Sequence, residues 1–214
     1  MSEDTRLGLL EAAERILIQE GVHALSVRHI GAVSGINGTL VTYHFGNVAG
    51  LLAELCRLNL EPMLAEWDGA AALSGSRATL REVLAAWLGP LIRPAAFSKD
   101  GRALVVFDEI ASHSQHEIRD ELLHVMIALG ARVAERLKPH LPHLGSRELR
   151  ARVRFISAAA LGPPPRVQLQ PVPGQEPLDG IHFLMAFAEA GLRGRALSGR
   201  SADAQPATRG GLFA

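Results

Sequence analysis

The feature that most constrains this fold is residues 26–46, where capping residues and glycines divide two short segments with helical periodicity. Ser26 can accept a hydrogen bond from a first-turn backbone N–H, so we expect it to begin a helix. The apolar face of that helix consists of Val27, Ile30 and Val33. Gly35 can adopt the left-handed conformation that ends a helix. The pattern therefore predicts a short helix between Ser26 and Gly35.

A second short helix is predicted directly after the first. Ile36 can fill the corner between the two, and Asn37 can act as an N-cap for a helix that opens at Gly38. Val41 and Phe45 lie four residues apart and share the inward face. The outward face keeps side chains that donate or accept hydrogen bonds, namely Thr39, Thr42, Tyr43 and His44. Short or flat side chains that donate and accept hydrogen bonds are what a helix needs to enter the DNA major groove.

Residues 35–46, Gly-Ile-Asn-Gly-Thr-Leu-Val-Thr-Tyr-His-Phe-Gly, resemble the recognition segment of the TetR/AcrR family of transcriptional regulators. Upstream, residues 12–17 and the pair at 20–21 are similar to the first helix of that family and its exit. Downstream, residues 50–52 resemble the start of its long fourth helix. The resemblance covers roughly residues 5–55 and implies a homeodomain-like three-helix domain followed by a helical effector-binding and dimerisation domain.

Composition supports an all-α fold for the whole chain. Alanine and leucine dominate and aromatic residues make up only 5%, which favours helices over sheet. We assign residues 1–47 to the helix-turn-helix domain and residues 48–195 to the helical effector-binding and dimerisation domain. Residues 196–214 are rich in small residues, and we expect them to be a disordered tail.

Apolar periodicity and helix-ending residues predict the remaining elements. The expected helices cover residues 5–20, 48–68, a segment capped by Ser76, 102–113, 115–137, a segment beginning at Ser146, and 178–193. Pro62 should kink the helix that begins at Val48, and residues 163–177 contain too many prolines to be helical. Gly31, inside a predicted helix, indicates the close approach of another helix.

The DNA-binding residues that we expect are Arg28, Asn37, Gly38, Thr39, Leu40, Thr42, Tyr43, His44 and Asn47. The two threonines can reach base edges, and Leu40 can meet a thymine methyl group. The resemblance implies that Tyr43 and His44 contact phosphates or bases near the groove wall. Arg28 is a phosphate candidate. The family usually carries a lysine at the position of Val48, so one of its phosphate contacts has no counterpart here.

Charge and motifs bear on the class of function. The net charge is zero, and residues 1–47 carry three arginines against five carboxylates, whereas DNA-binding domains are usually basic. The alternative is therefore an all-α small-molecule-binding protein or enzyme in which the helix-turn-helix is only structural. We expect no enzyme, because the sequence has no GxSxG, HExxH or phosphate-binding glycine loop. Asp120 and His124 lie one turn apart, but no compact ligand motif predicts a metal or cofactor.

The second domain is expected to bind an unknown, largely apolar small molecule. Candidate pocket residues are Trp67, Trp87, Phe107, Ile110, His113 and Met126, although core packing explains each of them equally well. The resemblance implies that effector binding moves the helix beginning at Val48, so that two recognition helices no longer match successive major grooves. The regulator would then be a repressor, with an activator as the alternative.

Dimerisation is expected to use the last two helices. The candidate interface residues are Phe155, Ala158, Ala159, Leu184 and Met185, because small residues let helices from two subunits approach closely. The family commonly pairs in this way. The alternative is that residues 158–160 pack within one subunit. The lone Cys56 excludes an internal disulfide, and the acidic N-terminus does not resemble a secretory leader, so we expect a cytoplasmic protein without a membrane span.

Overall fold

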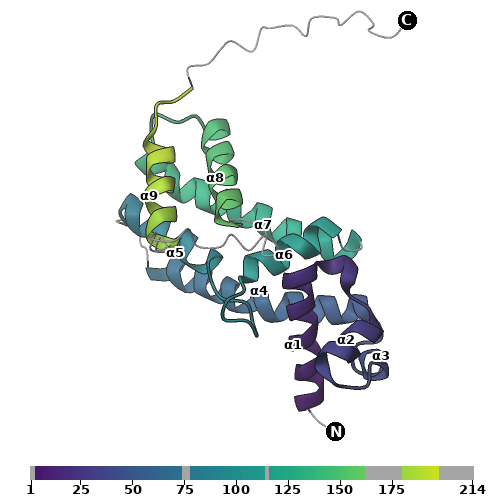
Figure 1. The fold of residues 1–214 in the computed structure, drawn as a ribbon. Coiled ribbons are helices and arrows are strands. Elements are labelled where there is room, and N and C mark those ends of the chain that lie inside the picture. The colour runs from purple at the N-terminus through teal and green to yellow at the C-terminus, as the bar shows by residue number, and fades with distance from the viewer. Residues whose placement is uncertain (1–2, 74–77, 114–115, 162–179, 198–214) are drawn as a thin grey trace, which may run out of the picture.

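A computed structural model describes residues 3–73, 78–113, 116–161 and 180–197, with only the backbone described for 70–73, 113, 116–118 and 161 (Figure 1). Over these ranges the regular structure is helical, apart from one isolated bridge between Pro94 and Arg102. The predicted all-α fold is therefore confirmed. The predicted loop at residues 163–177 and the tail beyond residue 197 lie outside the described residues.

The helices form two groups joined by a long helix. The N-terminal group consists of α1 (Glu3–Glu20), the 3-10 turn η1 (Val22–Ala24), α2 (Val27–Ser34) and α3 (Thr39–Phe45). The long helix is α4 (Val48–Leu73). The C-terminal group consists of α5 (Leu80–Leu91), α6 (Ala103–His113), α7 (His116–Leu137), the turn η2 (Lys138–His140), α8 (Ser146–Leu161) and α9 (Gly180–Arg193). Figure 1 shows α1–α3 at one end of the molecule and α8 with α9 at the other.

Two helix boundaries differ from the predictions by more than two residues. The long helix continues past residue 68 to Leu73 with Pro62 inside it, because the buried Met63 and Trp67 beyond the proline anchor this part to the core. The cap of α5 is Thr79, not Ser76. The Thr79 hydroxyl accepts from the Glu82 backbone N–H, and the Glu82 carboxylate accepts from the Thr79 N–H at 2.7 Å. This reciprocal pair satisfies two N–H groups that a helix start leaves without partners.

The buried side chains form one connected core from α1 to α9. At the N-terminal end, Leu10 and Leu17 of α1 pack in the same cluster as Ile30, Val41 and Leu51. Further along, the cluster includes apolar residues from the C-terminal helices, such as Trp87, Leu88 and Ile110. The helix-turn-helix thus shares one hydrophobic core with the C-terminal group of helices.

A buried carboxylate joins α1 to the C-terminal group. Glu14 is fully buried, and its Oε1 accepts from the backbone N–H groups of Phe97 and Ser98, each at 2.9 Å. Its Oε2 accepts from the Asn59 side-chain amide at 3.0 Å. The Asn59 Oδ1 in turn accepts from the Ala96 N–H at 2.8 Å. We call Glu14, Asn59 and residues 96–98 the Glu14 cluster; it connects α1, α4 and the loop between α5 and α6.

The chain after α9 is held against α8. Arg152 donates to the carbonyl oxygens of Gly194 and Arg195, at 2.9 and 2.8 Å. The Leu197 N–H donates to the Glu148 carboxylate at 3.2 Å, which together with Arg152 lowers the pKa of Glu148. Leu197, which we expected to belong to a disordered tail, is therefore tied to α8 by a backbone hydrogen bond.

Candidate nucleic-acid interface

The local signals that predicted α2 are confirmed. The Ser26 hydroxyl accepts from the His29 N–H at 3.1 Å and caps the helix. Gly35 follows the helix with φ of 69°, in the left-handed region where a side chain would be strained. Ile30 is fully buried. Cap, apolar stripe and glycine thus fix where α2 begins and ends and which face it buries.

The two helices of the motif meet at two glycines. A Cβ atom added to Gly31 would lie 2.9 Å from the Gly38 nitrogen, and one added to Gly38 would lie 2.5 Å from the Val27 carbonyl oxygen. Both distances are too short for a side chain. The predicted close approach at Gly31 is confirmed, and Gly38 serves the same crossing. This contact sets how far α3 stands out from α2.

Helix α3 follows a turn that the Asn37 side chain closes, and its N-cap residue, Gly38, makes no side-chain hydrogen bond. Asn37 Oδ1 accepts from the Thr39 N–H at 3.0 Å and from the Thr39 hydroxyl at 2.9 Å. Val41 is fully buried and Phe45 is partly buried against the same core. Asn37 therefore positions Thr39, whose hydroxyl oxygen keeps the capacity to accept a hydrogen bond.

The outer face of α3 presents Thr39, Thr42 and Tyr43 to solvent, and the Tyr43 side chain is 77% exposed. Leu40 is half-buried against the core, so only part of it faces outward. His44 differs from the sequence expectation of an outward side chain. It is half-buried, and its Nε2 is enclosed without a hydrogen-bond partner. The reason is its position three residues after the buried Val41, on the flank of the inward face.

The flanking candidates have different surroundings. Arg28 is exposed on α2, and no described residue forms an ion pair with it. Asn47 is exposed, but its Oδ1 accepts from the Gly50 N–H at 2.8 Å and so caps α4. Arg28 is therefore available to a phosphate, whereas the Asn47 oxygen is already engaged in holding the start of α4.

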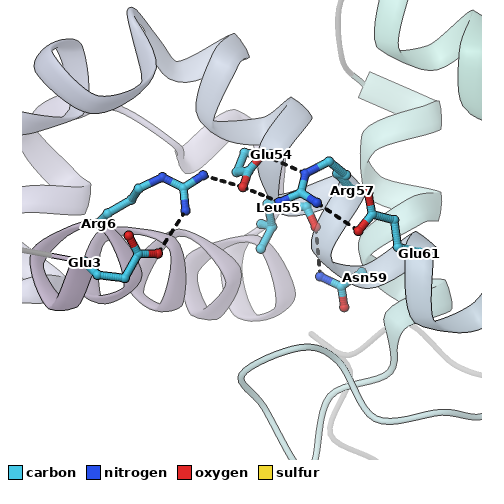
Figure 2. A network of polar contacts seen from close by, with 7 residues as sticks. All are labelled: Glu3, Arg6, Glu54, Leu55, Arg57, Asn59 and Glu61. Carbon is cyan, nitrogen blue, oxygen red and sulfur yellow. Dashed lines mark hydrogen bonds and ion pairs between the residues drawn. The ribbon is translucent and has the colours of Figure 1, made fainter.

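A network of charged side chains ties α1 to α4 (Figure 2). Arg6 forms ion pairs with Glu3 and Glu54, and its guanidinium lies 5.5 Å from the centre of the Phe45 ring. Arg57 donates to Glu54 at 2.7 Å and to Glu61 at 2.8 Å. The hydrogen bonds from Arg57 and Arg6 lower the pKa of Glu54 to about 2. Arg6 is therefore neutralised by α4 and is not a free phosphate contact.

Only two arginines of the described part of the helix-turn-helix domain remain without an ion pair, namely Arg15 and Arg28. Both are exposed. The low positive charge predicted for this domain is thus reduced further by the Arg6–Glu54 pair. Direct contacts from α3 must supply a larger share of any DNA affinity than in a basic domain.

The predicted pocket residues do not surround one cavity. Trp67 and Trp87 line a cavity of about 40 Å³ between α4, α5 and α7, and the Trp67 indole N–H donates to the Trp87 carbonyl oxygen at 3.1 Å. That volume suits water rather than an organic effector. Phe107 and Ile110 are core residues of α6, and Met126 lines a separate groove. The His113 side chain lies outside the described residues.

The residues predicted for the dimer interface differ in their exposure to solvent. Phe155 is 71% exposed, and Ala158 and Ala159 are exposed, whereas Ala160 is buried within the subunit. Leu184 does not fit the predicted interface, because its side chain is only 7% exposed and packs into the subunit's own core. Met185 is half-buried. Sequence reasoning missed Phe183 and Phe187 on α9, which are 57% and 50% exposed. Their four-residue spacing in the last helix was the available signal.

Neither a metal cluster nor a membrane span is found among the described residues. In that part of the chain, no three histidine, cysteine, aspartate or glutamate side chains lie close enough to hold a metal ion. None of the helices described is both long and apolar enough to cross a bilayer.

A known family model matches the N-terminal part of the chain. Residues 9–55, from α1 to the first turns of α4, match the family model for bacterial regulatory proteins of the tetR family. No functionally curated protein matches the chain significantly.

Solved structures give the fold. The regulator PfmR from Thermus thermophilus is 18% identical, with a TM-score of 0.64 over 87% of this chain and 94% of its own. A TetR-family regulator from a Rhodococcus species is 19% identical, with a TM-score of 0.60 over 89% and 100%. NalD from Pseudomonas aeruginosa, the secondary repressor of the MexAB-OprM multidrug efflux pump, is 22% identical, with a TM-score of 0.50 over 89% and 98%. Together with the helix-turn-helix geometry, these matches show that residues 9–55 form a helix-turn-helix of the tetR family and that the chain has the fold of TetR-family transcriptional regulators.

Proposed function

We propose that this regulator is a ligand-responsive repressor that binds an inverted-repeat operator as a homodimer. The observation that carries the proposal is the exposed row of Thr39, Thr42 and Tyr43 on a helix whose position is fixed by the Gly31–Gly38 crossing. A helix presented in this way enters the major groove and reads base edges. We propose residues 1–47 as the DNA-binding domain and residues 48–195 as the effector-binding and dimerisation domain.

The exposed aromatic face supports dimerisation. Phe155 on α8 and Phe183 and Phe187 on α9 are each exposed to solvent by half or more. Monomers rarely expose such patches, so we propose that α8 and α9 pack against the same helices of a second subunit. A two-fold dimer would place its recognition helices at half-sites about 34–36 Å apart, or at a multiple of that spacing.

The polar contacts between the two groups of helices support ligand responsiveness. The Glu14 cluster and the Arg6–Glu54 pair connect α1 to α4 and to the loop before α6. A ligand that shifts α4 or this loop would therefore displace the helix-turn-helix, and the two recognition helices would no longer match their half-sites. Ligand binding would then be coupled to release of DNA.

Selection of bound sequences from random duplex DNA tests the proposal. We expect enrichment of an inverted repeat, and loss of specific binding in the double variant Thr42→Ala/Tyr43→Ala with unchanged helical circular dichroism. The matched control is Thr5→Ala, a helical threonine outside the recognition helix. Unchanged operator affinity in the double variant would contradict the proposal and would favour a purely structural helix-turn-helix.

The dimer is tested by sedimentation. Phe187→Glu would bury an unpaired charge in the proposed interface, so we expect monomers with weak operator binding. The control Leu123→Glu carries the same change at an exposed leucine of α7. A Phe187→Glu protein that remains dimeric would place the interface elsewhere.

A further inference from the structure

A groove between α7 and α8 lies apart from the small cavity at Trp67 and Trp87. Its volume is about 690 Å³, which lies within the range of small-molecule sites. The α7 wall is apolar and includes Leu123, Met126 and Ile127. Ile127 is 69% exposed and Leu123 is 43% exposed, so this wall faces water in the subunit described.

The α8 wall carries three arginines, Arg147, Arg150 and Arg154. They are spaced by three and four residues and so lie on one face of the helix. No described residue forms an ion pair with any of them, and none of the described residues that line the groove is acidic. By contrast, Arg152 on the other side of α8 is paired with Glu148.

We propose that this groove binds an anionic amphiphile, a molecule with an apolar chain and a carboxylate or phosphate head group. The chain would cover the exposed leucine and isoleucine of α7, and the head group would accept hydrogen bonds from the arginines of α8. Guanidinium groups bind both head groups in a two-point geometry, so the charge selects an acid over a neutral or cationic molecule. This inference deepens the proposed function by naming a ligand class, and its regulatory part rests on that function.

Gly130 provides a way to fill the groove without disturbing the fold. It lies on the groove wall, and a Cβ atom added there would have no heavy atom within 4 Å. Gly130→Leu should therefore occupy the space that the chain of the ligand would take. The helix itself tolerates the change, because leucine is a better helix former than glycine.

Calorimetric titration below the micelle concentration tests the site, with dodecanoate and dodecyl phosphate as the probes. We expect one or both to bind, and dodecyltrimethylammonium and butanoate to bind at least about tenfold more weakly, because each lacks one half of the recognition. Arg150→Gln/Arg154→Gln should weaken binding about tenfold or more. The charge-matched control Arg81→Gln/Lys99→Gln, at two exposed cations elsewhere, should leave it unchanged.

Several results would overturn the site. One is the absence of binding by both anionic probes at about 1 mM. Another is equal affinity for dodecyltrimethylammonium or equal binding by Gly130→Leu. A change of sedimentation behaviour in Gly130→Leu or in the arginine variant would instead assign the groove to an interface between copies of the chain.

The titration contains no DNA, so its result is independent of the regulatory proposal. Operator binding is then measured separately with and without dodecanoate. Release of DNA in the wild type but not in Gly130→Leu would support the regulatory part. Probe binding that leaves operator affinity unchanged would keep the site and refute only its role in regulation.

Discussion

Removal of the Glu14 carboxylate should destabilise the protein far more than its place in the first helix indicates. The fully buried side chain accepts three hydrogen bonds, from the N–H groups of Phe97 and Ser98 and from the Asn59 amide. Glu14→Ala leaves the two backbone N–H groups without partners and the Asn59 amide with only its bond to the Leu55 carbonyl oxygen, at about 1–3 kcal/mol for each lost bond. Phe97 and Ser98 are half-buried, so water can replace part of the loss, and we expect about 3–5 kcal/mol in total.

Thermal unfolding followed by circular dichroism measures this loss. For a chain of this length, about 1 kcal/mol corresponds to roughly 2–4 °C, so Glu14→Ala should lower Tm by about 6–20 °C. Glu14→Gln should cost less, because its oxygen can still serve the loop while its NH2 group faces the Asn59 donor. The control is Glu11→Ala, an exposed glutamate of the same helix. An equal effect of Glu14→Ala and Glu11→Ala would refute the reasoning.

A double-mutant cycle with Asn59→Ala extends the test. Because Asn59 donates to Glu14 and accepts from Ala96, the two substitutions affect one network and should be clearly non-additive. Additive losses would mean that the two side chains stabilise the loop independently.

Three further predictions concern charge and the thiol. The pKa of Glu54 is about 2 against an ordinary 4.5, so the ion pairs of Glu54 stabilise the fold fully above about pH 4.5 and are lost as the pH falls towards 2. The difference in Tm between wild type and Glu54→Gln should therefore shrink between pH 4.5 and 2. A difference that stays constant over this interval would contradict the prediction. Burial, with a smaller contribution from Glu121, raises the pKa of Cys56 to about 11. At pH 8, maleimide should therefore react with this thiol only after denaturation, and rapid reaction of the native protein would show that the thiol is not buried. Operator affinity should fall with salt less steeply than for about ten phosphate contacts per dimer, because Arg6 is paired with Glu54; a steeper slope would show that other cations face the DNA.

The sequence predicted best what depends on neighbouring residues. The cap at Ser26, the left-handed Gly35 and the close approach at Gly31 are local requirements of the backbone, and each is readable from residue type and spacing. The all-α class followed in the same way from periodicity and composition. Helix ends were less predictable where two caps compete, as at Ser76 and Thr79, because only the capping box with Glu82 decides between them.

Features that depend on distant contacts were not predictable. Glu14 appeared as one more charge on α1, because its partners lie at residue 59 and at residues 97–98. Trp67, Trp87, Phe107 and Ile110, which were chosen as pocket residues for their size, are buried in the core, because the volume left between helices follows from packing that no local pattern encodes. Leu184 and Phe187 on the same helix face opposite environments, which only the placement of α9 against its neighbours determines.

The Glu14 cluster also limits how parts of this regulator can be exchanged with those of relatives. A hybrid that joins residues 1–47 to a foreign second half would separate the Glu14 carboxylate from the Asn59 amide and from the N–H groups of Phe97 and Ser98. A fusion of residues 1–47 to another C-terminal domain would thus need to include Asn59 and residues 96–98, or to replace Glu14 by an apolar residue. A fusion boundary in the linker between α3 and α4 would therefore divide the Glu14 cluster, so a working boundary must follow the contacts in space and not the order of the chain.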